Sequence, residues 1–353
     1  MFTGSQALLR IGLWGLGTVG LPGLVSSRHS GIGGILSFHR IYEAQSHEFG
    51  SQAASVSPRH FRHLLGTLVA QGYTFLSMSG LVERLTERGG QHRQRKVVCL
   101  TFDDGYVDSY TAAYPICRDF GVPMTVYLVS GIIRREFPMW SLVLEEVLAA
   151  NECLELTWCG EMIKLNCRGS GEKRTAYFAL ASRLACGSTA HIQQACTELA
   201  VRYGVDPMTL TDRNALAAPM IAEMQQSGLV EFGAHSVHHP RLGDLDETAA
   251  RCEIEQSKRD CESLSGVEVR HFAYPYGDAK AAGVREATIC RKLGFHSAVT
   301  TESNTIFETD RERLMGLPRL TYNGNFQSAH MLDLLLSGAL PLLKRRWNAG
   351  RLS

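Results

Sequence analysis

Residues 97–105 read VVCLTFDDG, and this stretch decides the fold. Its first six residues form an apolar run of the length expected for a buried strand. Two carboxylates, Asp103 and Asp104, follow directly and cannot both lie in a hydrophobic core. Adjacent acidic side chains at the end of a buried strand are typical of an α/β enzyme, although a single Asp in this position is often a solvated cap.

Apolar runs alternate with helical spacing on both sides of this stretch. Further strands are predicted at 34–38, 73–78, 124–129, 229–232, 269–273 and 296–299. Helices are predicted at 58–71, 109–120, 246–264 and 282–293. This alternation is typical of parallel βα units, so the predicted fold class is α/β, a (β/α) barrel with its chemistry at the carboxyl ends of the strands.

The domain organisation follows from where the strand signal stops. Between Trp140 and Pro219 the spacing is helical, which predicts a helical insertion at about 140–219. We expect an apolar, glycine-rich segment at 1–33, the barrel with its insertion at 34–325, and a helical tail at 326–353. The basic residues 344–346 in that tail could contact a membrane surface, but a solvated helix end is the simpler interpretation.

Composition excludes several classes of protein. The 353 residues are 44% hydrophobic and 20% charged with a net charge of +1, which fits a soluble globular protein and offers no basic surface for nucleic acid. Ten cysteines without a Cys-x-x-Cys pair favour a reducing cytoplasm. Residues 11–27 are uncharged, but glycines and Pro22 break them, so a bilayer span of about 20 residues is not expected; export or membrane association remains the alternative.

A histidine cluster, His235-Ser236-Val237-His238-His239-Pro240, follows the strand predicted at 229–232. Residues four apart project to one side of a helical turn, so His235 and His239 could hold one cation. A group of surface histidines is the alternative interpretation. A carboxylate at another strand end makes the metal site the stronger hypothesis.

A third strand end reads Phe272-Ala273-Tyr274-Pro275-Tyr276-Gly277. Pro275 and Gly277 predict a turn, and the backbone N–H of Tyr276 could point at a developing oxyanion. The alternative is an ordinary βα turn.

These three motifs, in this order and at wide spacing, resemble those of the NodB-homology polysaccharide deacetylases, carbohydrate esterase family four. The resemblance runs from about residue 34 to about residue 322 and implies a deformed (β/α) barrel. It also implies that Asp103 is the general base and that Asp104, His235 and His239 bind a divalent metal. We expect Zn²⁺, with Co²⁺, Ni²⁺ or Mn²⁺ as alternatives, because two imidazoles and one carboxylate leave open positions for catalysis.

Two departures from the family pattern concern the catalytic groups. The Leu-x-His motif that supplies a general acid in many members is not evident, and Ser37-Phe38-His39 resembles the first-strand histidine of the branch that deacetylates poly-N-acetylglucosamine. His39 is therefore the predicted acid, against a structural strand-end role. Ala273 stands where the family usually has an arginine that partners the base, and Arg319 is the candidate replacement.

The predicted function is removal of N-acetyl groups from an N-acetylated glycan or glycan precursor. Water attacks, Asp103 takes its proton, and the metal and the Tyr276 amide stabilise the oxyanion. An O-acetyl ester, an N-formyl sugar or a cyclic amide would pass through the same oxyanion, and a non-catalytic glycan-binding protein is a further alternative. The residues predicted to contact sugar are Pro275, Tyr276, Tyr106 and Trp140. The glycan and the oligomeric state stay open.

Overall fold

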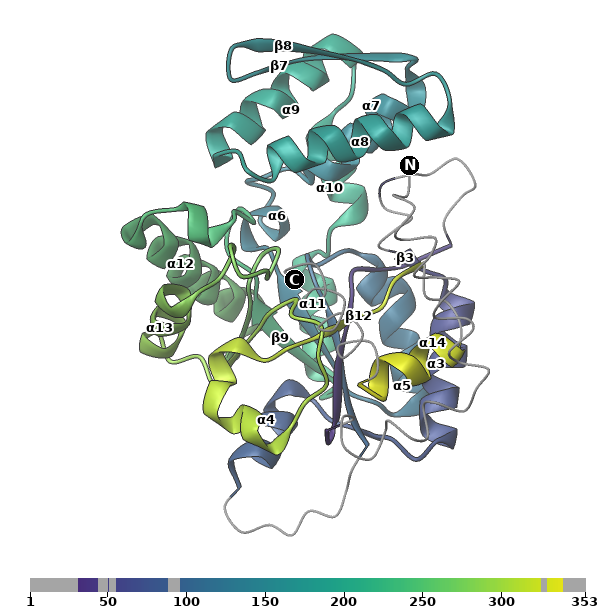
Figure 1. Cartoon of the computed structure of the whole chain (residues 1–353), viewed down its shortest axis with the longest axis vertical. Coiled ribbons are helices and arrows are strands. Elements are labelled where there is room, and N and C mark those ends of the chain that lie inside the picture. Colours follow the sequence, from purple (N-terminus) through teal and green to yellow (C-terminus); the bar gives the residue numbers. More distant parts are fainter. Residues whose placement is uncertain (1–30, 44–49, 51–54, 88–95, 325–328, 339–353) are drawn as a thin grey trace, which may run out of the picture.

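The computed structural model describes residues 31–43, 50, 55–87, 96–324 and 329–338, and its centre is one parallel sheet (Figure 1). The strands in spatial order are β11 (Ser297–Val299), β10 (His271–Ala273), β9 (Val230–Ala234), β6 (Met124–Leu128), β5 (Val97–Phe102), β1 (Gly33–Phe38) and β12 (Leu320–Thr321). Strand β4 (Thr74–Phe75) pairs with the first residues of β5. The sheet curls into the deformed (β/α) barrel that the sequence predicts, and the fold class is confirmed.

Helices cover the outside of this barrel. They are α3 (Pro58–Ala70), α5 (Tyr114–Phe120), α6 (Ser130–Ile133), α11 (Ala218–Gln226), α12 (Glu247–Ser265), α13 (Val284–Lys292) and α14 (Ala329–Leu336). Helix α4 (Met78–Thr86) instead closes the amino end, where Met78, Leu81 and Leu85 pack with the interior residues of the strands. Helix α3 illustrates how they form, because the Ser57 side chain accepts the His60 N–H at its first turn and Pro58 sets the backbone there. Short helical turns lie at Ser109–Ala113, Leu242–Asp244 and Glu308–Gly316, and a small ladder joins β2 (Arg40–Ile41) to β3 (Ser55–Val56).

The insertion forms a separate layer above the barrel in Figure 1. Its elements are α7 (Trp140–Ala150), β7 (Cys153–Trp158), β8 (Glu161–Asn166), α8 (Ser170–Leu184), α9 (Thr189–Tyr203) and α10 (Pro207–Asn214). The expectation that this region lacks strands is wrong, because β7 and β8 pair as an antiparallel hairpin. Leu154 and Leu156 alternate with more exposed residues on β7 and are buried against the helices.

A second correction concerns the strand predicted at 73–78. Only Thr74 and Phe75 pair with β5, and helix α4 begins at Met78. The Ser77 hydroxyl accepts the backbone N–H of Gly80, so a local cap starts a helix where the apolar pattern suggested that a strand continues.

The ladder register brings the three motifs to one end of the barrel. Phe38 pairs with Phe102, and Ala234 pairs with Phe272. The residues that come directly after each strand therefore lie together at the carboxyl end of the sheet. Side chains alternate along β5, so Cys99 packs inside the barrel while Leu100 packs against the outer helices. This alternation also sends Asp103 inward.

Some predictions concern residues that the structure does not describe. Residues 1–30, with most of the apolar segment, and residues 339–353, with the basic end of the tail, lie outside the described residues. Among the described residues, no helix is both long and apolar enough to cross a bilayer.

Candidate active site

Three side chains from two strand ends converge at the carboxyl end of the barrel. Oδ1 of Asp104 lies 3.6 Å from Nε2 of His235 and 3.5 Å from Nε2 of His239. One ligand atom from each residue lies within 4.8 Å of the others. The predicted metal-binding set is therefore brought together from positions more than a hundred residues apart.

An unusual backbone conformation orients the Asp104 side chain toward the histidines. Asp104 and Gly105 have φ angles of 71° and 73°, in the left-handed region that residues other than glycine rarely adopt. A Cβ on Gly105 would lie 2.8 Å from Cδ1 of Ile133, so a side chain here would have to displace Ile133 as well as adopt a left-handed backbone. Strain of this kind persists where the surrounding structure holds it, and it often marks a functional site.

The histidine pair does not lie on a helical turn, which corrects the geometry that its spacing suggested. Residues 235–240 form a loop after β9, with φ of 63° at Ser236 and 57° at His239. The Ser236 hydroxyl accepts the backbone N–H of His239 at 3.0 Å and closes the loop. The two imidazoles meet because the chain doubles back, with ring centroids 4.9 Å apart.

The two rings face Asp104 in different ways. Nδ1 of His235 lies 2.7 Å from the carbonyl oxygen of Ala273, and since a carbonyl can only accept, Nδ1 carries a proton and Nε2 is the nitrogen turned toward Asp104. Burial lowers the pKa of His239 to about 4, against the opposing charge of Asp104. The His239 ring is therefore neutral near neutral pH.

The separations fit a metal ion. Ligands about 2.1 Å from a tetrahedral ion lie roughly 3.4 Å apart, close to the 3.5 and 3.6 Å found between Asp104 and the two histidines. Two imidazoles and one carboxylate form the donor set of a catalytic site with an open position. The residues present therefore fit a divalent cation.

Asp103 does not belong to this triad and is held by Arg319 instead. Nη1 and Nη2 of Arg319 donate to the two carboxylate oxygens at 2.7 and 2.8 Å, and both residues are buried. The contact predicted from the sequence is present. Nε of Arg319 donates to the Thr300 carbonyl at 3.0 Å, and this bond fixes the orientation of the guanidinium group. Burial acts to raise the pKa of Asp103, but the Arg319 guanidinium, with nearby His235 and His39, holds that pKa well below its usual value.

His39 and Tyr276 border the same centre. The backbone N–H of Asp103 donates to the Phe38 carbonyl at 3.0 Å, so half-buried His39 follows its strand beside Asp103. The Tyr276 ring lies 4.8 Å from the His239 ring, and the Tyr276 backbone is left-handed with φ of 62°. The third motif therefore turns sharply beside the triad.

The other predicted sugar contacts differ in exposure. Pro275 is buried beside Tyr276 in the turn. Tyr106 is 8% exposed and the Arg40 guanidinium lies 4.7 Å over its ring, which corrects the expectation that this ring offers an open face to a sugar. Trp140 starts helix α7 in the insertion and packs, half-buried, against the main hydrophobic core.

Three supporting contacts were not predicted from the sequence. Nε of Arg40 donates to buried Asp108 at 2.9 Å, which ties the first strand end to the loop after Gly105. Glu253 of α12 accepts from His238, and Arg241 pairs with Asp278. The position of Arg40 beside His39 at a strand end was a usable signal. Glu253 lies within a surface helix, and nothing in its local sequence indicates a contact with the histidine loop.

Comparison with known proteins assigns the chain to a family. A family model described as polysaccharide deacetylase matches residues 90–158 and 189–297, about half of the chain, and the gap falls within the insertion. Over 99 residues the chain is 30% identical to YxkH of Bacillus subtilis (strain 168), provisionally named as a polysaccharide deacetylase. That match covers 28% of this chain and 32% of YxkH, so the chain matches about a third of that relative.

Solved structures share the fold. The deacetylase PplD of Streptococcus pyogenes, in complex with acetate, superposes with a TM-score of 0.56 at 20% identity over 86% of this chain and 96% of its own. IcaB of Ammonifex degensii gives 0.55 at 17% identity over 86% and 97%. A de-N-acetylase of Aggregatibacter actinomycetemcomitans gives 0.53 at 15% identity over 86% and 98%. At these identities the likeness concerns the fold, while the family model covers the chain's own motifs. The chain belongs to the polysaccharide deacetylase family of enzymes.

Proposed function

We propose that this protein removes N-acetyl groups from an amino-sugar-containing polysaccharide or glycan precursor. The observation that carries the proposal is that two adjacent carboxylates have different partners. Asp104 faces His235 and His239, while Asp103 is held by Arg319 and stays outside the triad. One carboxylate is thus available as a ligand and its neighbour as a base.

Asp104, His235 and His239 would hold the divalent cation, with Zn²⁺ the expected ion. A bound cation of this kind supplies a Lewis acid that polarises an acyl oxygen and makes water more acidic. Asp103, kept ionised by Arg319, accepts the proton of the attacking water. The bidentate guanidinium fixes the orientation of the carboxylate, so its remaining lone pairs can point toward the substrate.

The leaving group needs a proton because an amine anion leaves poorly. His39 lies next to Asp103 at the first strand end, and we assign it this role. The backbone N–H of Tyr276, in the turn beside His239, donates to the developing oxyanion. Each reacting position is then served by a residue from a different strand end, as in other barrels with carboxyl-end sites.

Release of acetate tests the proposal directly. The full chain is incubated with N-acetylated chito-oligosaccharides and with O-acetylated xylan, before and after chelation. We expect acetate from the amide substrate, loss of release on chelation, and recovery when Zn²⁺, Co²⁺, Ni²⁺ or Mn²⁺ is restored. Turnover confined to the xylan would make the protein an O-acetyl esterase. A metal-loaded chain that releases acetate from neither substrate would contradict the enzymatic proposal.

Substitution of the base separates catalysis from metal binding. Asp103→Asn should lower kcat by about 10²–10⁴-fold, the usual contribution of a positioned general base, while metal content is unchanged. Asp119→Asn is the matched control, because this Asp pairs with Arg62 on the surface with about half of its side chain exposed. Normal rates in Asp103→Asn would show that the base is another residue.

A further inference from the structure

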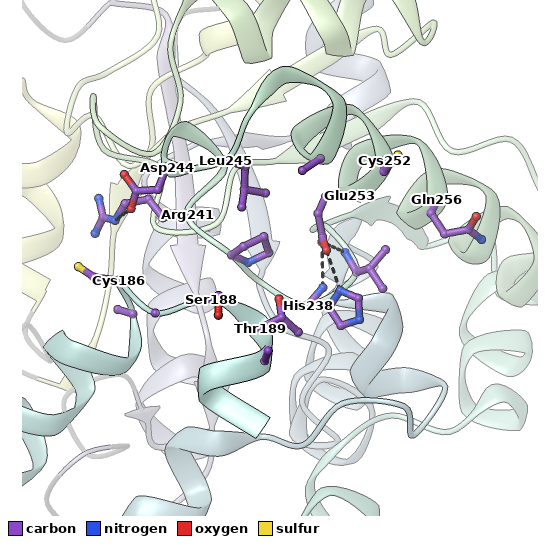
Figure 2. A pocket seen from close by; sticks show the side chains of 16 residues that line it. Cys186, Ser188, Thr189, His238, Arg241, Asp244, Leu245, Cys252, Glu253 and Gln256 are labelled. Carbon is purple, nitrogen blue, oxygen red and sulfur yellow. Dashed lines mark hydrogen bonds and ion pairs between the residues drawn. The ribbon is translucent and has the colours of Figure 1, made fainter. Parts of the chain in front are cut away.

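A pocket of about 660 Å³ lies between the insertion and the barrel (Figure 2). One wall is residues 185–190, the turn between α8 and α9 of the insertion. The facing wall is the loop that carries the histidine pair, at Val237, His238, Pro240 and Arg241, together with the first turns of α12. This volume is within the range of about 300–1,000 Å³ typical of small-molecule sites.

The pocket lies next to the candidate active site, with the Tyr276 ring between them. Arg241, which lines the pocket, has its guanidinium carbon 4.9 Å from the centre of the Tyr276 ring. That ring lies 4.8 Å from the ring of His239. Arg241 is fixed by two contacts of 2.8 Å from Nη1 to the carboxylate of Asp278. Tyr276 thus has the metal-binding triad on one side and the pocket wall on the other.

The barrel wall of the pocket is rigidly built. Glu253 accepts the backbone N–H groups of Val237 and His238 at 2.9 and 3.0 Å, and its other oxygen contacts Nδ1 of His238 at 2.6 Å. His238 also lies edge-on to Phe137, with centroids 5.4 Å apart. In Figure 2 the dashed contacts of Glu253 reach from α12 to this loop. A wall fixed in this way needs no rearrangement to receive a ligand.

The chemistry of the lining suits an uncharged hydroxyl-rich ligand. Hydroxyl and amide groups come from Ser188, Thr189 and Gln256, between apolar surfaces of Val237 and Leu245. Such groups both donate and accept, as sugar hydroxyls require of their partners. The charged groups of the lining already have partners: Glu253 contacts His238, while Arg241 is held by Asp278 and lies 3.9 Å from Asp244. A uronate or phosphate would therefore find no unpaired cation in this lining.

We propose that this pocket is a subsite for the sugars that flank the acetylated residue, so that the substrate is an oligomer or polymer of uncharged amino sugars. The inference rests on the proposed function and deepens it. The insertion supplies one wall of the subsite and the histidine-bearing loop supplies the other. A single acetylated sugar would use the triad and leave this pocket unused.

The chain carries its own reporters for this proposal. Cys186 and Cys252 are exposed on opposite walls of the pocket, while Cys159 is exposed at the hairpin turn and does not line it. The full chain is alkylated with iodoacetamide with and without N-acetylated chitohexaose, and each peptide is quantified by mass spectrometry. At a probe concentration about ten times its dissociation constant, we expect alkylation of Cys186 and Cys252 to slow about tenfold.

Cys159 should react at its original rate and serves as the internal control. Unchanged rates at Cys186 and Cys252 would overturn the proposal, and so would equal slowing at all three thiols. Protection without acetate release would retain the subsite while refuting the proposed deacetylation. The two ideas can therefore fail separately.

Filling the pocket provides the kinetic test. Ala249 lines the pocket on the first turn of α12, and its neighbour Thr248 is exposed and does not. Ala249→Trp should lower the ratio of kcat/KM for the hexamer to that for N-acetylglucosamine by about tenfold, while Thr248→Trp keeps the wild-type ratio. Both variants should retain metal. An unchanged ratio in Ala249→Trp, with acetate still released, would reject the subsite and leave the deacetylase.

Discussion

One cluster of histidine and carboxylate lies at the amino end of the barrel and another at the carboxyl end, and they differ in how their polar atoms are satisfied. At the amino end, Nε2 and Nδ1 of His271 each lie 2.9 Å from a serine hydroxyl, those of Ser79 and Ser297. Glu231 accepts the backbone N–H of Ser79 at 3.1 Å. At the carboxyl end, Asp104 lies 3.5 and 3.6 Å from the two imidazole nitrogens that face it.

This difference distinguishes a cluster whose polar atoms bond to one another from a cluster whose geometry fits a cation. Normal hydrogen bonds span about 2.7–3.2 Å, so the amino-end cluster satisfies itself. The carboxyl-end atoms are too far apart for normal hydrogen bonds to one another, and their separations match those of ligands around a single cation. The two clusters contain the same residue types, so it is the geometry and not the composition that tells them apart.

The largest effect should come from the buried ion pair at the carboxyl end. Arg319→Met removes both hydrogen bonds to Asp103 and leaves its carboxylate buried and unpaired. We expect the free energy of unfolding to fall by about 3–5 kcal/mol, as for other broken buried pairs. Urea denaturation measures it, with Arg319→Lys as a control that keeps the charge and should lose less. A loss under about 1 kcal/mol would mean that the pair is dispensable for folding.

Metal affinity should distinguish the two clusters. His239→Ala removes one of three ligand atoms at the carboxyl end. Because even the loss of an outer-shell contact costs about 10–100-fold, affinity for Zn²⁺ should fall by at least about 100-fold. Calorimetric titration measures it, with His271→Ala as the matched histidine. Equal losses in both variants would remove the distinction between the clusters.

Acid should destabilise the protein through the amino-end cluster. Burial lowers the pKa of His271 to about 4, below the usual value of about 6.5, against the opposing charge of Glu231. The unfolded chain therefore binds a proton that the folded chain excludes. The stabilising contribution is present above pH 6.5 and is lost as pH falls toward 4.

Between pH 6 and 5 the loss should be about 1.2 kcal/mol. Urea denaturation of the metal-free chain at several pH values measures this slope, and His271→Gln should reduce it. An identical slope in His271→Gln would assign the acid sensitivity to other groups.

The smallest effect is expected at Ser297. Ser297→Ala removes the hydroxyl that contacts Nδ1 of His271 and leaves that buried nitrogen without its partner. The free energy of unfolding should fall by about 1 kcal/mol, with no change in metal affinity or in acetate release. A large loss of activity would show that the amino-end cluster influences the carboxyl-end site, which the separation of the two clusters does not predict.

The sequence was sufficient where a local pattern determined the structure. The apolar run ending in Asp103 and Asp104 predicted a buried strand, which is confirmed, and placed two acidic side chains at its carboxyl end. The sequence did not predict the hairpin at 153–166. Leu154 and Leu156 alternate with polar residues, but this pattern is short and the sequence on both sides of it is helical. The contact between Arg319 and Asp103 was predicted from a missing family arginine, and no local pattern would have suggested it.

The geometry of the histidine loop could not be predicted from its spacing. Positive φ angles at Ser236 and His239 are tolerated because Glu253, on a helix further along the chain, accepts two backbone N–H groups of the loop. Such support is a tertiary property. The opposing wall of the pocket, at 185–190, is likewise defined only by packing between regions distant in sequence.

The insertion begins after α6 and ends before α11, and its two ends contact each other. The backbone N–H of Met139 donates to the Thr211 hydroxyl at 3.0 Å, and Arg135 donates to the Leu216 carbonyl at 3.1 Å. The chain therefore enters and leaves the insertion at neighbouring points. An insertion of another length could start and end at the same two points without changing the order of the barrel strands. Such an exchange would alter the pocket wall at 185–190 while the residues at the carboxyl ends of the strands keep their places in the sequence.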